Sequence, residues 1–220
     1  MNKFDEVLDQ LQKHLDCSVQ NWFLGAGVSY QSNIPLMYAL TSRVEALVNE
    51  RETEISQEIY NALKEDLPPK SHIEHVLSHI GDLLALSERA ASKQCHFAGK
   101  SYSMKQLLEL YKALTRNIGE TIRYGYRAPN PDVGKEELIG TATDPVVEID
   151  HHRRFLKALF SGRANLERRS KLSFFTTNYD TLLEDALSLE RKLTIDGFSG
   201  GAVAYWNPSE ELTSTAKDSR

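Results

Sequence analysis

Two glycines lie one residue apart directly after a short apolar run, in Gly25-Ala26-Gly27-Val28-Ser29. Glycine permits positive φ and lets backbone N–H groups approach a ligand closely. A strand that leads into such a turn and then into a helix can bind a pyrophosphate at the helix N-terminus. We therefore interpret Gly25, Ala26, Gly27 and Ser29 as a nucleotide-binding segment. The alternative is a plain tight turn.

The dinucleotide fingerprint of dehydrogenases is incomplete in this segment. The third glycine of G-x-G-x-x-G would fall at position 30, which is Tyr30. The nearest downstream acids, Glu45 and Glu50, fall on a predicted helix and not at the end of a second strand. An ordinary NAD-dependent dehydrogenase is therefore disfavoured.

A second group of polar residues, Thr176-Thr177-Asn178-Tyr179-Asp180, follows another apolar run. Ligands of open α/β sheets bind beyond the carboxyl ends of the strands. Asn178 offers a donor and an acceptor, which suits ribose hydroxyls or a positioned water. We predict that Thr177, Asn178 and Asp180 contact a nucleotide. The alternative for Asp180 is that it caps a helix beginning near Thr181.

The elements that must position these residues follow from the hydrophobic pattern. Residues 19–24 and 172–176 are predicted buried strands. Helices are predicted from the spacing of apolar residues in several segments, at 3–15, 35–48, 53–63, 73–84, 104–118, 155–160 and 182–187. Ser71 and Glu74 have the spacing of a capping box for the fourth of these helices.

The remaining segments carry weaker signals. A polar stretch, 94–103, separates two helices, and residues 124–150 combine glycines and prolines with little periodicity. A weak strand candidate lies near Leu193. The order strand, glycine turn, helices, strand, helix predicts an α/β fold with a Rossmann-like parallel sheet, in which residues 36–165 form a mainly helical insertion.

The two polar segments together resemble the sirtuin superfamily. Residues 23–29, followed by Asn33-Ile34-Pro35, resemble its glycine motif, and residues 174–180 resemble its second motif. The Thr-Thr-Asn-Tyr-Asp form looks like the sirtuin-like NAD⁺ hydrolases of prokaryotic anti-phage defence systems. Residues 197–201, Gly-Phe-Ser-Gly-Gly, look like a loop that follows this motif in those proteins. The resemblance covers about residues 19–40 and 170–205.

Departures from the protein deacylases narrow the expected activity. Where deacylases have Gly-Ile-Pro-Asp-Phe-Arg, this chain continues Asn33-Ile34-Pro35 with Leu36, Met37 and Tyr38. Two cysteines in all are too few for the four-thiolate zinc module of deacylases. Both differences argue against deacylation, and no metal is implied.

The resemblance also implies a catalytic histidine in a downstream Lys-Leu-His-Gly-like segment, but no histidine follows His152. We therefore expect a sirtuin-like NAD-binding domain over 1–220 that is incomplete, truncated at the C-terminus before the histidine strand. Such a chain alone should expose a sheet edge and be catalytically silent.

Other histidines are weaker candidates. His72, His75 and His79 lie along one stripe of a predicted helix, which suits metal ligation or, as we favour, a polar flank of the apolar face. His151 and His152 are adjacent, so their side chains point about a hundred degrees apart on a helix and do not serve one site together.

Composition limits the classes of partner. The net charge of −5 gives little attraction for a phosphate backbone, so direct nucleic-acid binding is not expected. No apolar run has the length of a membrane span and residues 1–15 lack a signal-peptide core, so we expect a cytoplasmic protein.

These inferences lead to one preferred function. We expect an NAD⁺ hydrolase that cleaves the nicotinamide–ribose bond, with NAD⁺ as substrate and Asn178 as the catalytic residue. The resemblance implies a homo-oligomeric, NAD-depleting defence effector with a possible partner ATPase or other defence subunit. The alternatives are a non-catalytic module that senses NAD⁺ or ADP-ribose, and a scaffold subunit of a defence complex.

Overall fold

The computed structural model describes residues 3–15, 19–130, 132, 134–161, 172–194, 198–199 and 205–206. The chain divides into two compact units. The first, here the sheet–bundle unit, comprises residues 21–148 and 173–180. The second, the terminal unit, comprises the described residues within 1–20, 149–172 and 181–220.

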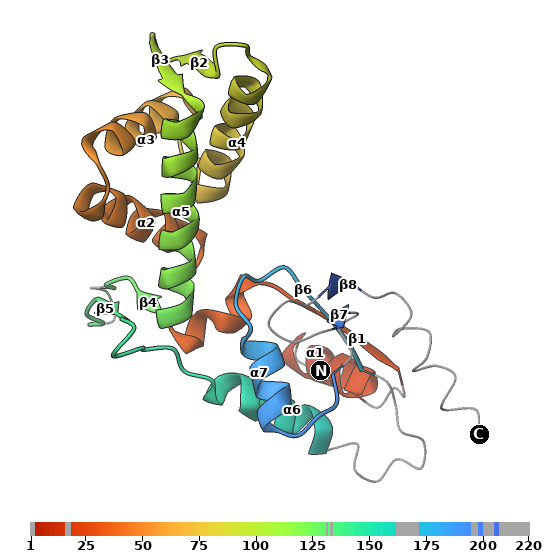
Figure 1. Cartoon of the computed structure of the whole chain (residues 1–220). Helices are drawn as coiled ribbons and strands as arrows, with labels where there is room; N and C mark the ends of the chain where they lie inside the picture. The colour runs from red at the N-terminus through yellow and green to blue at the C-terminus, as the bar shows by residue number, and fades with distance from the viewer. Residues whose placement is uncertain are drawn as a thin grey trace. The chain divides into compact units, whose positions relative to one another are not determined.

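Eleven elements build the sheet–bundle unit (Figure 1). In chain order they are β1 (Gln20–Leu24), the 3₁₀ helix η1 (Ala26–Ser32), α2 (Met37–Arg51), α3 (Glu54–Asp66), α4 (Ile73–Arg89), β2 (Gln94–Phe97), β3 (Lys100–Ser103), α5 (Met104–Tyr124), β4 (Tyr126–Arg127), β5 (Leu138–Ile139) and β6 (Leu172–Thr176). The helices predicted at 53–63, 73–84 and 104–118 are confirmed as α3, α4 and α5.

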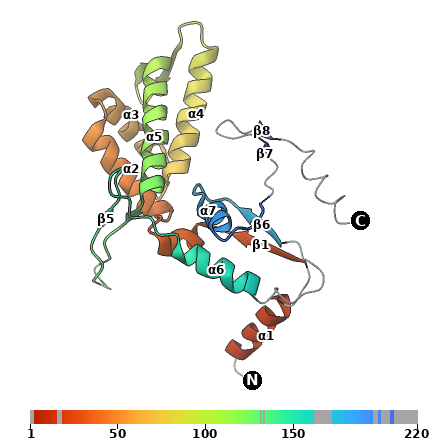
Figure 2. The same cartoon turned by 60° about the horizontal axis from the view of Figure 1, so that its bottom comes forward.

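The core of this unit lies in the four-helix bundle α2–α5. The long helix α5 packs against α2, α3 and α4 (Figure 2). Its Leu107, Leu110 and Leu114 are fully buried. Each such side chain stabilises the fold by about 1.5–3 kcal/mol through its removal from water. The helix begins at a capping box in which Gln106 N donates to Ser103 Oγ and Ser103 N donates to Gln106 Oε1.

Two local predictions in the bundle are corrected. The polar stretch 94–103 is an antiparallel hairpin, β2–β3, whose register pairs Gln94 with Ser103. The positive φ of Ala98 (48°) and Gly99 (74°) gives the tight turn that joins its strands. The predicted capping box of Ser71 and Glu74 is wrong, because α4 begins one residue later with His72 at its N-cap.

Residues 124–148, expected to carry little structure, are fixed by specific hydrogen bonds. Strands β4 and β5 pair antiparallel. Tyr126 N donates to Asn33 O at 2.8 Å, and Glu148 N donates to Ser32 O at 3.1 Å. A Cβ on Gly140 would lie 1.7 Å from Tyr124 O, so only glycine fits this crossing. The segment is therefore attached to the end of η1.

The central feature of the sheet is the parallel pair β1–β6, which confirms both predicted strands. Their predicted burial is wrong at several positions, since Phe23 is 74% and Phe175 is 55% exposed. Within the described residues the sheet has two strands, and the fold is mixed α/β. Leu193 is 92% exposed and lies outside any strand.

The terminal unit contains α1 (Lys3–Leu15), α6 (Asp150–Ser161), α7 (Leu182–Leu189) and the paired two-residue strands β7 (Phe198–Ser199) and β8 (Tyr205–Trp206). Helices α6 and α7 pack together through buried leucines such as Leu156 and Leu183. Arg153 Nε donates to Glu190 Oε1 at 2.8 Å and holds the pKa of that carboxyl below its ordinary value.

Helix α1 is amphipathic, as predicted, and its C-terminal carbonyls are capped by a side chain. Gln20 Nε2 donates to His14 O at 3.0 Å and to Leu15 O at 2.7 Å. This satisfies acceptors that have no partner inside the helix. None of the helices among the described residues is long and apolar enough to cross a membrane.

Candidate functional site

The glycine segment continues β1 into η1, as the sequence predicts, but not through positive φ. Gly25, the N-cap of η1, has φ −104° and ψ −178°, which is extended backbone open to any residue. Gly27 also lies outside the left-handed region. A Cβ added to either glycine would meet no atom of the described part of the chain within 4 Å. Gly25, Ala26 and Gly27 are exposed, so their backbone borders open space.

Ser29 joins this segment to the end of β6. Its side chain is fully buried, and its Oγ accepts a 3.1 Å hydrogen bond from Asn178 Nδ2. Asn178 N in turn donates to Thr176 Oγ1 at 3.0 Å, which turns the chain at the end of the strand. The structure thus brings together two predicted site residues that lie 149 positions apart in the sequence.

The oxygen of the Asn178 amide, Oδ1, is buried and accepts no hydrogen bond from the residues that the structure describes. A buried polar atom without a partner costs about 1–3 kcal/mol, so an orphan of this kind calls for a functional or solvent partner. Asn178 is therefore fixed by one end and has a free acceptor at the other.

Tyr179, the next residue, links the site to the helical bundle. Its hydroxyl donates to Glu74 Oε1 on α4. This hydrogen bond, with partial burial, raises the pKa of Tyr179 to about 12. The sequence predicts that Glu74 caps its helix, but its carboxylate instead accepts a hydrogen bond from Tyr179 of the second motif. Glu74 Oε2 also lies 3.9 Å from His72 Nδ1, too far for a hydrogen bond.

Asn33, which the sequence places in the glycine motif, lies at the C-terminal end of η1. It is buried, has φ 61° and ends the 3₁₀ helix. Its Nδ2 donates to Val146 O at 2.7 Å, and its Oδ1 accepts from Arg127 Nη1 at 3.3 Å. Asparagine tolerates the left-handed region, which is the sequence signal for its place at the end of η1, whereas its side-chain bonds reach residues that are distant in sequence.

The remaining predicted site residues are placed but not tested by the structure. Thr177 is exposed and Asp180 is half-buried. Asp180 is not the cap of the next helix, because Thr181 occupies the N-cap and its hydroxyl donates to Asp185 Oδ2 at 2.9 Å. Nucleotide contacts of Thr177 and Asp180 remain predictions. Of the loop 197–201, only residues 198 and 199 are described.

The rings of His75 and His79 on α4 have hydrogen-bond partners, whereas the ring Nδ1 of His72 at the N-cap is buried and has none among the described residues. His72 N donates to His75 Nδ1 at 3.1 Å, and His79 Nε2 lies 2.9 Å from Asp66 Oδ2. Over the described ranges, no group of three or more metal-ligating side chains is present. His152 is buried on α6 in the terminal unit, and His151 is half-buried.

Comparisons with known proteins give no assignment. A scan against protein-family models found no match, and a search of curated proteins found no similar sequence.

Proposed function

We propose that the protein is a sirtuin-like NAD⁺ hydrolase that cleaves the bond between nicotinamide and ribose. The observation that carries the proposal is the Ser29–Asn178 hydrogen bond, which leaves Asn178 Oδ1 buried and without a partner among the described residues. This atom is an acceptor placed where the ends of two parallel strands meet, the usual ligand position in α/β sheets. A ribose hydroxyl or an attacking water is a donor of the required kind.

The glycine segment supports the same assignment. Gly25 and Gly27 are required neither by backbone conformation nor by protein packing, because a Cβ at either position meets nothing. What a missing Cβ still provides is close approach of the backbone to a ligand. We assign Gly25, Ala26, Gly27 and Ser29 to the NAD⁺ pyrophosphate, with Thr177 and Asp180 near the ribose.

Cleavage of the nicotinamide–ribose bond requires few catalytic groups. Nicotinamide leaves from a cationic ring, so departure needs no acid, and the transition state resembles an oxocarbenium ion. The protein must hold the ribose and place one water in line, which are effects of orientation and electrostatics. Asn178 contributes to one of these tasks if its Nδ2 stays on Ser29 Oγ and its Oδ1 accepts a hydrogen bond from the ribose or from the water. The resemblance to sirtuins assigns the base to a histidine.

The setting of the activity rests on the same resemblance. We propose a cytoplasmic, homo-oligomeric effector that depletes NAD⁺ in anti-phage defence, with a Rossmann-type sheet and an ATPase or other defence subunit as partner. A sensor that binds NAD⁺ without turnover is the second candidate. The sensor and the hydrolase differ in one measurable product, nicotinamide.

The test compares Asn178→Ala with Asn49→Ala, an exposed asparagine of α2, in the protein expressed from its complete gene. Release of nicotinamide from NAD⁺ is followed by chromatography, with thermal unfolding as the control for folding. Loss of transition-state orientation predicts at least a roughly hundredfold drop for Asn178→Ala and none for Asn49→Ala. Unchanged turnover in folded Asn178→Ala would refute the assignment. NAD⁺ binding without nicotinamide release in the unmutated protein would favour the sensor.

A further inference from the structure

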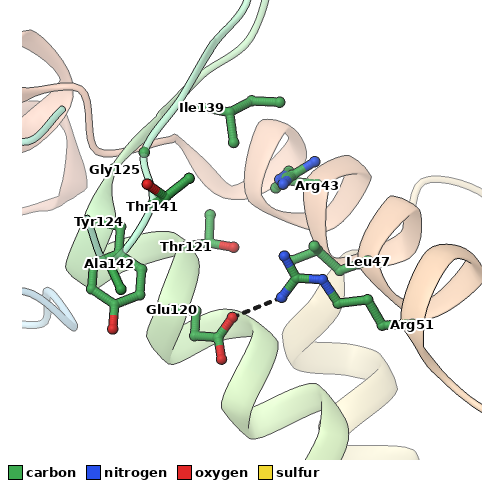
Figure 3. A pocket seen from close by; sticks show the side chains of 11 residues that line it. Arg43, Leu47, Arg51, Glu120, Thr121, Tyr124, Gly125, Ile139, Thr141 and Ala142 are labelled. Carbon is green, nitrogen blue, oxygen red and sulfur yellow. Dashed lines mark hydrogen bonds and ion pairs between the residues drawn. The ribbon is translucent and has the colours of Figure 1, made fainter. Parts of the chain in front are cut away.

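A pocket of about 270 Å³ lies in the sheet–bundle unit at the C-terminal end of α5 (Figure 3). Its charged walls are Arg43 and Arg51 of α2 and Glu120 of α5. Tyr124 closes one side, and residues 139–142 close another. The volume lies just below the range of about 300–1,000 Å³ that drug-sized ligands occupy, so it suits a smaller molecule.

The walls of this pocket are fixed where the backbone of Gly140 crosses that of Tyr124 and Gly125. Gly140 N donates to Gly125 O at 2.9 Å, and Val146 N donates to Tyr124 O at 2.8 Å. Gly125 has φ 88°, and a Cβ there would lie 2.9 Å from a Val146 methyl. Because Gly125 is required by its positive φ and Gly140 by its close backbone crossing with Tyr124, residues 139–142 are held against the end of α5. The cavity is a built feature and not a gap between loose segments.

Arg43 has binding capacity that the protein does not use. Its guanidinium carbon lies 5.6 Å from the centroid of the Tyr126 ring, which orients the group. Among the described residues, no acceptor bonds its N–H groups and no carboxylate pairs with it. A guanidinium presents five donors in a fixed fork that matches a phosphate. A half-buried, oriented and unpaired arginine is therefore ready to bind an oxyanion.

Arg51, the second arginine of the pocket, determines the net charge of its walls together with Glu120. Arg51 Nη1 bonds Glu120 Oε2 at 2.8 Å, so the charged walls carry a net charge of +1. Arg43, Leu47 and Arg51 follow one stripe of α2, and the two arginines are eight residues, or about 12 Å, apart along the helix. Because Arg51 is paired with Glu120 and Arg43 has no such partner among the described residues, we place a ligand phosphate on Arg43 and the polar body of the ligand toward Arg51.

We propose that this pocket binds a small organic phosphate of mononucleotide size, with its phosphate on Arg43 and its body extending toward Tyr124 and Arg51. The site is separate from the Ser29–Asn178 pair and does not depend on the proposed hydrolase activity. Aromatic and guanidinium side chains at the far end offer stacking surfaces for a base.

The test measures calorimetric binding of AMP, adenosine and inorganic phosphate to the protein. AMP should bind, inorganic phosphate should bind at least about tenfold more weakly, and adenosine should not bind detectably, since a bidentate phosphate contact is a large part of the affinity. Arg43→Met, which keeps the packing of the side chain, should weaken AMP at least about tenfold. Arg89→Ala, an exposed arginine of α4 outside the pocket, is the matched control and should change the affinity less than twofold.

Glu120→Gln gives an effect of opposite sign and does not depend on the folding of the Arg43 variant. Removal of the carboxylate frees Arg51 and raises the net charge of the walls, so AMP should bind about threefold or more tightly. Backbone amides of Gly140 and Thr141 should exchange hydrogen more slowly with AMP bound, because both belong to the segment that forms the wall.

The same titrations separate this pocket from the proposed NAD⁺ site. AMP binding should persist in Asn178→Ala. Any of three results would overturn the proposal: adenosine that binds as tightly as AMP, an AMP affinity that is unchanged in both Arg43→Met and Glu120→Gln, or AMP binding that is lost in Asn178→Ala but kept in Arg43→Met.

Discussion

In the helical bundle, α5 buries Leu107, Leu110 and Leu114 completely, whereas on the adjoining strands Phe23 is 74% and Phe175 is 55% exposed. The three leucines face the interior of the bundle, although other apolar side chains of its helices, such as Leu86 at 53%, are exposed. Strands β1 and β6 carry exposed aromatic side chains, and the segments that follow them carry the polar pair Ser29–Asn178. Packing does not explain either feature. Residues that stability does not account for are the ones to examine for function.

The glycines show the same difference more sharply. Gly125 and Gly140 in the 124–148 segment are required by positive φ and by a backbone crossing, respectively. Gly25 and Gly27 at the end of β1 are required by neither. One pair therefore serves the fold, and the other pair is free to serve a ligand.

The largest expected effect comes from alanine substitutions of these glycines. Gly140→Ala puts a Cβ 1.7 Å from the carbonyl oxygen of Tyr124, which no side-chain rotation relieves. We expect a loss of more than about 4 kcal/mol in the free energy of unfolding, measured by urea denaturation. Gly25→Ala and Gly27→Ala should stay within about 0.5 kcal/mol of the unmutated protein and lower nicotinamide release at least about tenfold. Equal stability of all three variants would remove the distinction.

A second pair of substitutions compares apolar burial. Leu110→Ala removes a fully buried side chain from the bundle and should cost about 2–5 kcal/mol in the free energy of unfolding. Phe23→Thr replaces an exposed side chain with another good strand former and should change it by no more than about 0.5 kcal/mol. A large loss for Phe23→Thr would mean that the strand face is covered in the protein in solution.

Asn33 connects the end of η1 to the 124–148 segment. Two variants separate the effect of its backbone conformation on stability from the effect of its side-chain hydrogen bonds. Asn33→Ala loses two side-chain hydrogen bonds and puts alanine at φ 61°, so a loss of about 2–3 kcal/mol is expected. Asn33→Gly keeps the backbone conformation and loses only the bonds, and should recover about 1 kcal/mol of that loss. Denaturation of both proteins checks the difference. Indistinguishable stabilities would show that the left-handed conformation of Asn33 is not maintained.

The smallest effect concerns Tyr179. Its hydrogen bond to Glu74 raises the pKa of the phenol to about 12, from an ordinary value near 10. The folded protein holds this proton more tightly, so the stabilisation is full below about pH 10 and is lost as the pH rises through about 12. Because Tyr179 is 57% exposed, the contribution stays below about 1 kcal/mol.

Ultraviolet titration checks this assignment by difference. The spectrum of the unmutated protein minus that of Tyr179→Phe should show one phenol that ionises near pH 12, which separates it from Tyr102 and Tyr126. A difference transition near pH 10 would show that Glu74 does not hold the hydroxyl.

Periodicity and strand composition predicted α1, α3, α4, α5 and both strands of the central sheet, because these elements carry local signals. The cap at His72 was missed, since histidine is not a typical N-cap residue. The hairpin β2–β3 was missed although Cys95 and Phe97 alternate before Ala98-Gly99. The roles of Glu74 and Asn33 depend on contacts that are distant in sequence, which no local pattern reveals.

If Asn178 Oδ1 and the glycine segment face a nucleotide, a crystal structure of the protein with ADP-ribose will show it directly. We expect a ribose hydroxyl or an ordered water within about 3.2 Å of Asn178 Oδ1, with Nδ2 still on Ser29 Oγ. We also expect the pyrophosphate against the backbone of residues 25–27. Density for the ligand elsewhere, or a protein donor on Oδ1 in the complex, would contradict the assignment of Asn178 and the glycine segment to the nucleotide.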